Sequence, residues 1–139
     1  MKKSELDLTN LINSVNSLKE CYTDFCAEQD SKMQKYIKDS CIKRFEYTYE
    51  TAKKIMNKFL KKEYDKSEKD LTINNIFREM YAIGIIENFE NWTEYRVRRN
   101  TTSHEYDENI TYPTINLIPD FIKDIEILIK NLEKTLIND

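Results

Sequence analysis

An arginine and a histidine stand five positions apart within residues 99–107. Arg99 ends an apolar stripe that starts at Phe89 and recurs every three or four residues, and His104 is the only histidine among 139 residues. A guanidinium on an inward face needs a partner, so Arg99 either meets an internal carboxylate or faces a cleft that accepts a phosphate. Since an imidazole can transfer a proton and a guanidinium can stabilise phosphate charge, the pair is a candidate for phosphoryl chemistry.

The backbone must change direction between these two side chains. On one unbroken helix, His104 would lie about 140° around the axis from Arg99. Asn100 and the two threonines after it disfavour a helix, and residues 102–105 read Thr-Ser-His-Glu, the pattern of a capping box that opens a new helix. His104 would then occupy the second helical position, where the helix dipole favours a neutral imidazole and a bound anion.

If an RNA strand lies across this segment, these side chains can act on its ribose and phosphate groups. We expect His104 to take the proton from a ribose 2′-hydroxyl while Arg99 carries the charge that develops on the phosphate. Arg96, Asn100 and Ser103 are the expected substrate-binding residues, and no metal or other cofactor is required. One histidine does not readily serve as both base and acid, so we expect a homodimer with two facing motifs. In the alternative interpretation, these polar side chains only hold a helix break together.

The composition predicts the elements that carry these residues. One glycine and two prolines among abundant Leu, Ile, Lys and Glu favour an all-α fold. We expect a single domain over residues 1–139, built as an up-and-down four-helix bundle with an additional short helix. Gly84 should cap the third helix, Asn88 should start the fourth, and Pro113 and Pro119 should interrupt the chain before the last. The apolar periodicity predicts helices over residues 6–27, 33–61, 72–82, 89–99 and 119–137.

The same periodicity assigns several side chains to the interior. Met33 and Tyr81 fall on inward stripes, and Cys21, Cys26 and Cys41 are expected to be reduced thiols in the core. A metal cluster is not expected from one histidine and cysteines without close spacing. The first residues lack the apolar core of a secretion signal, and no apolar run is long enough to span a membrane. We therefore expect a cytoplasmic protein.

Positive charge is concentrated in the second predicted helix. The net charge of −3 argues against a general nucleic-acid binder, but residues 40–62 carry seven basic side chains against only Glu46 and Glu50. This helix could guide RNA or nucleotide phosphates to the motif, although a solvated lysine face is the more common meaning of such a pattern. Tyr47 and Tyr49 lie off its apolar stripe, where either a partner or the other helices could cover them.

The motif and three other stretches together resemble the HEPN superfamily. Residues 99–108 read RNTTSHEYDE, which is similar to the motif RNxxSHxYDE of its nucleotidyltransferase substrate-binding branch. Residues 45–50 (FEYTYE), residues 78–86 (REMYAIGII) and Trp92 occur in the family's order, so the resemblance covers about residues 11–132. Two features differ: residues 50–53 read Glu-Thr-Ala-Lys where relatives usually carry a tryptophan, and the third helix lacks a Ser-Pro-Arg-like start.

The resemblance implies a partner and a mode of control. Members of this branch are small helical partners of minimal nucleotidyltransferases (MNT), and many MNT–HEPN pairs act as toxin–antitoxin modules. It implies a dimeric, metal-independent ribonuclease whose motif tyrosine, here Tyr106, receives AMP from the partner and is thereby silenced. The alternative is a non-catalytic subunit in which Arg99, His104 and the basic helix hold a nucleotide or acceptor for a separate nucleotidyltransferase chain.

Overall fold

Helices make up most of the described chain. A computed structural model describes residues 1–101 and 108–138, and within them the only pairing of β type is an isolated bridge between Lys2 and Ile137. The expected all-α bundle is confirmed. Among the described residues, no helix combines the length and apolar character that a membrane crossing requires. The α-helices are α1 (Thr9–Ala27), α2 (Ser31–Tyr64), α3 (Ile73–Ala82), α4 (Phe89–Thr101) and α5 (Glu108–Thr135), with short 3-10 helices at Lys3–Glu5 and Glu68–Asp70.

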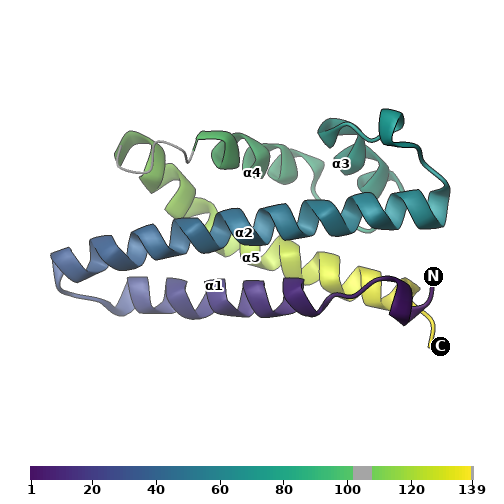
Figure 1. The fold of residues 1–139 in the computed structure, drawn as a ribbon. Coiled ribbons are helices and arrows are strands. Elements are labelled where there is room, and N and C mark those ends of the chain that lie inside the picture. The colour runs from purple at the N-terminus through teal and green to yellow at the C-terminus, as the bar shows by residue number, and fades with distance from the viewer. Residues whose placement is uncertain (102–107, 139) are drawn as a thin grey trace.

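Helices α1 and α2 form an antiparallel pair on which the rest of the chain is assembled (Figure 1). α5 crosses behind this pair and contacts α1, α2 and α4. α3 and α4 follow one another along the side of α2 that faces away from α1 in this view. The end of α4, which carries the arginine of the motif, is thereby placed beside the middle of α2.

Local signals fix the connection between α3 and α4. Gly84 has a φ of +80°, and the N–H of Ile85 donates to the carbonyl of Met80 at 2.9 Å, as in a Schellman helix end. Asn88 caps α4, because its Oδ1 accepts a hydrogen bond from the backbone N–H of Asn91 at 2.9 Å. Both predicted caps are confirmed.

An aromatic cluster joins α2, α4 and α5. Phe121 of α5 is fully buried, and its ring centroid lies 4.7 Å from that of Phe45, 5.0 Å from that of Tyr95 and 6.3 Å from that of Trp92. These contacts have the edge-to-face geometry that aromatic pairs prefer. Trp92 also packs on Phe77 of α3, with 5.6 Å between centroids. The cluster therefore packs α4 against α2, α3 and α5.

The expected interruption of the last helix is wrong. α5 continues without a break through Pro113 and Pro119, and it starts eleven residues before the predicted position 119, at Glu108. A proline removes one N–H donor and crowds the preceding turn of a helix. Ile115 and Ile118, which stand between the two prolines, are buried in the core. We attribute the continuity to this packing, which offsets the local cost of each proline.

Three side chains assigned to the interior lie on the surface. Met33, Tyr81 and Cys26 are exposed, whereas Cys21 and Cys41 are buried as predicted. Met33 lies in the first turn of α2 and Tyr81 in the last turn of α3, and in both places the neighbouring described helices do not cover the side chain. Periodicity identifies a helix face, but it does not tell how far the neighbouring helices extend.

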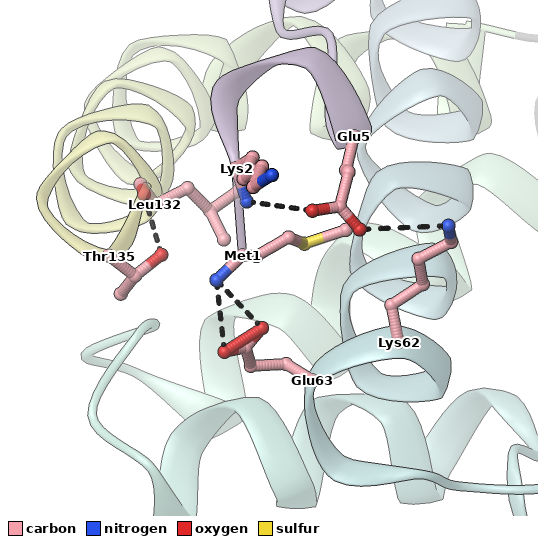
Figure 2. A network of polar contacts seen from close by, with 7 residues as sticks. All are labelled: Met1, Lys2, Glu5, Lys62, Glu63, Leu132 and Thr135. Carbon is pink, nitrogen blue, oxygen red and sulfur yellow. Dashed lines mark hydrogen bonds and ion pairs between the residues drawn. The ribbon is translucent and has the colours of Figure 1, made fainter. Parts of the chain in front are cut away.

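Two helices also differ in length from the prediction. α1 begins at Thr9 rather than at residue 6, and α2 extends at both ends beyond the predicted residues 33–61. Among the polar residues at the end of α2, Glu63 is ion-paired with the N-terminal ammonium group. The ammonium group of Met1 lies 3.1 Å from the Glu63 carboxylate, and the ammonium group of Lys62 lies 3.8 Å from the Glu5 carboxylate. Figure 2 shows both contacts.

Candidate functional site

Arg99 lies in the last turn of α4 and is ion-paired with two carboxylates of α2. Its Nη1 is 3.5 Å from Glu46 Oε2, and its Nε is 3.3 Å from Glu50 Oε1. The two glutamates are four residues apart, so they lie one above the other on a single face of α2. Of the two partners that the sequence left open, an internal acid and a phosphate, the structure provides the acid.

This ion-paired group is partly open to water. The side chain of Arg99 keeps 31% of its surface exposed and that of Glu50 keeps 35%, whereas Glu46 keeps only 17%. The Oε1 atom of Glu46 is buried and has no hydrogen-bond partner among the described residues. The carboxylates therefore orient the guanidinium, whose Nε atom is buried, while part of the Arg99 side chain remains exposed.

Two further cations lie in the same region: Lys53 pairs with one of the carboxylates, and Arg96 acts electrostatically on the neighbouring Tyr49. Lys53 Nζ lies 3.0 Å from Glu50 Oε2. Arg96, one turn before Arg99, donates a hydrogen bond from Nη1 to Asn74 Oδ1 of α3 at 3.0 Å. Three cations and two carboxylates leave the described part of the site with one positive charge in excess, which favours the approach of an anion such as a phosphate.

Tyr49 is enclosed beside these charges. It is buried, and burial raises the pKa of its hydroxyl; Glu50 raises the pKa further, while Arg96 and Arg99 oppose the rise. The phenol therefore stays neutral near pH 7 and serves as a wall of the site. The sequence left open whether a partner or the other helices cover the two tyrosines of α2. The helices of the bundle cover Tyr49, but Tyr47 remains 57% exposed.

A second buried acid supports α4 from the side of α5. Asp124 accepts hydrogen bonds from the hydroxyl of Tyr95 and from Asn91 Nδ2, the latter at 3.1 Å. Burial and then the bond to Asp124 raise the pKa of Tyr95, so its hydroxyl remains a donor. This network ties α5 to the helix that carries Arg99.

The site residues expected from the sequence fall into two groups. Arg96 and Arg99 lie one turn apart on α4, and Asn100 follows as an exposed residue. α4 ends at Thr101, two residues beyond the predicted end. The predicted helix break and capping box lie outside the described residues, as do the other candidates, Ser103, His104 and Tyr106.

The sequence interpretation did not assign the two glutamates to the site. The sequence nevertheless contained a signal. The stretch 40–62 has seven basic residues and only two acidic ones, Glu46 and Glu50. Their spacing of one helical turn is that of two side chains that converge on one partner. The isolated pair of acids in a basic helix therefore indicated a cationic partner on a neighbouring helix.

Comparisons with known proteins give the family. The family described as nucleotidyltransferase substrate binding protein like matches residues 6–134. A protein of Haemophilus influenzae named "Probable ribonuclease HepT" is 29% identical over 109 residues, which are 76% of this chain and 74% of that protein.

Solved structures share the fold. The Haemophilus influenzae protein HI0074, described as a substrate binding domain of a nucleotidyltransferase, has a TM-score of 0.84 at 26% identity, over 91% of this chain and 99% of its own. A Thermus thermophilus protein matches with a TM-score of 0.75 at 20% identity, over 88% of this chain and 98% of its own, which is a likeness of fold alone. The match over residues 6–134 and these shared structures lead to one conclusion: the chain belongs to the nucleotidyltransferase substrate binding protein-like family, a branch of the HEPN superfamily.

Proposed function

We propose that this chain is a metal-independent endoribonuclease, the HEPN toxin of an MNT–HEPN toxin–antitoxin pair. The observation that carries the proposal is the placement of Arg99. Its guanidinium is oriented by Glu46 and Glu50, and 31% of the whole side-chain surface is exposed. Arg99 stands five residues before the only histidine of the chain. The ribonuclease name of the Haemophilus influenzae relative supports the same activity.

In the proposed reaction, His104 removes the proton of a ribose 2′-hydroxyl and the resulting oxygen attacks the adjacent phosphorus. The bond from phosphorus to the 5′-oxygen of the next nucleotide breaks, which leaves a 2′,3′-cyclic phosphate. In a homodimer, His104 of the second copy donates a proton to the departing oxygen. Arg99 stabilises the charge on the phosphoryl oxygens, and Arg96, Asn100 and Ser103 bind the phosphate or orient the imidazole.

Arg99→Ala is expected to lower kcat/KM for RNA cleavage about tenfold or more, because it removes the charge that faces the phosphate. Arg98 is a matched control, since it is the adjacent arginine but pairs with Glu94 of its own helix at 2.7 Å. Arg98→Ala is expected to stay within about twofold of the wild type, as a surface ion pair contributes little. Cleavage of end-labelled RNA in the presence of a chelator measures both values.

The stability of each variant separates catalysis from folding. Arg99→Ala leaves Glu46, only 17% exposed, without its cation, so the free energy of unfolding is measured beside the activity. Arg99→Lys keeps the charge but loses the two-point geometry of the guanidinium, and it should recover part of the activity. Equal losses of activity in the Arg98 and Arg99 variants would contradict a specific role for Arg99.

We propose that the partner nucleotidyltransferase silences the enzyme by transferring AMP from ATP to Tyr106. The phenolic oxygen forms a bond to the α-phosphorus, pyrophosphate leaves and the phenolic proton is released. The added negative charge would compete for the phosphate site near Arg99. After incubation with the cognate partner and ATP, mass spectrometry should find the nucleotide on Tyr106. Tyr112 is the control, as it is 43% exposed; modification of both residues, or of neither, would count against the proposal.

The second candidate function is a non-catalytic subunit that binds a substrate or nucleotide for a nucleotidyltransferase. The description of the structural relative HI0074 favours it. In that role Arg99, His104 and the basic face of α2 would hold a phosphate without chemistry. A wild-type rate of RNA cleavage no higher than that of His104→Ala would support this function over the ribonuclease.

A further inference from the structure

A pocket of about 350 Å³ lies between α1 and α2, apart from the ion-paired group of Arg99. This volume is within the range of small-molecule sites, about 300–1,000 Å³. From α2 the pocket is lined by Lys43, Arg44 and Tyr47, and from α1 it is lined chiefly by asparagine and serine side chains. None of the lining residues is acidic. A lining that contains two cations and no acid favours an anionic ligand.

The guanidinium of Arg44 is fixed at the wall of this pocket. Its Nη1 donates to the backbone carbonyl of Ser17 at 3.0 Å, a bond that joins α2 to α1. A guanidinium has five N–H donors, so this bond leaves others that can meet a phosphate. The cation is therefore positioned before a ligand arrives, which lowers the entropic cost of binding.

Tyr47 gives the pocket an aromatic platform. Its side chain is 57% exposed, although it stands in the middle of a helix with a well-filled core face. Nucleotide bases stack on such rings, and cations beside the ring accept the phosphate. Asn10 and Asn13 of α1 add amide groups that can both donate to and accept from the edge of a base.

Other pockets in the described residues lack this combination. The groove between α2 and α3 has Lys53 and Lys54 but no aromatic side chain. The two pockets along α5 are lined in part by acids, Glu133 among them. The chemistry of an aromatic ring, two cations and amides is therefore specific to the α1–α2 pocket among those described.

We propose that the α1–α2 pocket binds one nucleotide unit, with its base stacked on Tyr47 and its phosphate held by Lys43 and Arg44. Tyr47 follows Glu46 directly, and successive residues of a helix are about 100° apart around the axis. The pocket and the Arg99 group thus lie on two sides of the same turn of α2. A single RNA strand that crosses α2 can contact both, so the inference rests on the proposed function for the choice of RNA as the polymer.

Binding of two defined probes tests the proposal. The first is AMP, and the second is a 2′-O-methyl RNA oligonucleotide, which lacks the free 2′-hydroxyl and stays intact during the titration. Tyr47→Ala is expected to weaken binding about tenfold, since the base loses the ring on which it stacks. Lys43→Ala should reduce the salt dependence of oligonucleotide binding, because one phosphate contact is lost. Tyr81→Ala and Lys123→Ala are the controls, as both residues are exposed on other helices.

The outcomes distinguish the source of the nucleotide. Loss of AMP binding in Tyr47→Ala identifies a site for a free nucleotide, while loss of oligonucleotide binding alone identifies a subsite for RNA. If Tyr47→Ala binds both probes as Tyr81→Ala does, or if the wild type binds neither, the proposal is overturned. Cleavage of unmodified RNA is measured separately. If the wild type does not cleave RNA but its binding of the probes depends on Tyr47, only the ribonuclease proposal is refuted. If the wild type cleaves RNA but Tyr47→Ala binds the probes as the wild type does, only the proposal for the pocket is refuted.

Discussion

His104→Ala is expected to lower the rate constant of RNA cleavage by about 10²–10⁴-fold, the usual contribution of a general acid or base. No other histidine in the sequence can replace the lost imidazole. In a homodimer the substitution removes both the base and the acid, so we expect the larger part of this range. Single-turnover cleavage of labelled RNA measures the effect, and growth of cells that express the chain alone provides a second readout.

Two controls separate chemistry from folding in this experiment. Added imidazole should restore part of the cleavage by His104→Ala, because it can enter the space of the missing ring and transfer the same proton. A residue that only stabilises the fold would not be rescued in this way, and the melting temperature of the variant should stay near that of the wild type. Cleavage by His104→Ala at the wild-type rate would refute the ribonuclease proposal. Harmless expression of both forms, without cleavage, would favour the substrate-binding subunit.

The sequence predicts structure best where one residue type determines the local backbone. Gly84 is the only glycine, and the positive φ of a helix end explains its position. Asn88 supplies a side-chain acceptor for the exposed N–H groups at the start of α4. Both effects depend on neighbours within about five residues, so no tertiary information is needed to predict them.

Prediction fails where distant parts of the chain decide the outcome. Pro113 and Pro119 each disfavour a helix locally, yet α5 continues through them because its buried residues pack on α1, α2 and α4. Met33 and Tyr81 have suitable positions for burial, but they remain 47% and 53% exposed. These errors share one cause. A single sequence shows which face of a helix is apolar, but it does not show which other helices pack on that face.

The candidate site shows the same division. The inward position of Arg99 was enough to predict that it needs a negatively charged partner. It was not enough to predict whether that partner is a carboxylate of the protein or a bound phosphate. That choice depends on α2, fifty residues earlier, and on the aromatic contacts that bring Glu46 and Glu50 opposite α4. Once that pairing is known, the charge pattern of α2 can be interpreted: its two acids hold the arginine, while Lys43 and Arg44 face a separate pocket.

Phe121→Ala is expected to lower the free energy of unfolding by about 3–5 kcal/mol, the usual cost of removing a buried aromatic ring. Domains of this size have a total stability of about 5–15 kcal/mol, so the loss should shift the urea midpoint strongly. Trp92 is the only tryptophan and lies 6.3 Å from Phe121 between ring centroids, so its fluorescence reports the transition. Tyr36→Ala is the control, because Tyr36 is exposed and its loss should change stability by less than about 0.5 kcal/mol.

A substitution of Phe121 also tests which interactions hold Arg99 in place. Phe121 contacts Phe45, which precedes Glu46, and Tyr95, which lies one turn before Arg99. If the aromatic cluster sets the distance between α4 and α2, Phe121→Leu should lower kcat/KM for RNA even at temperatures where the protein remains folded. Full activity in a folded but less stable Phe121→Leu protein would mean that the ion pairs with Glu46 and Glu50 hold the arginine by themselves. A parallel loss of activity and stability would instead assign that positioning to the core.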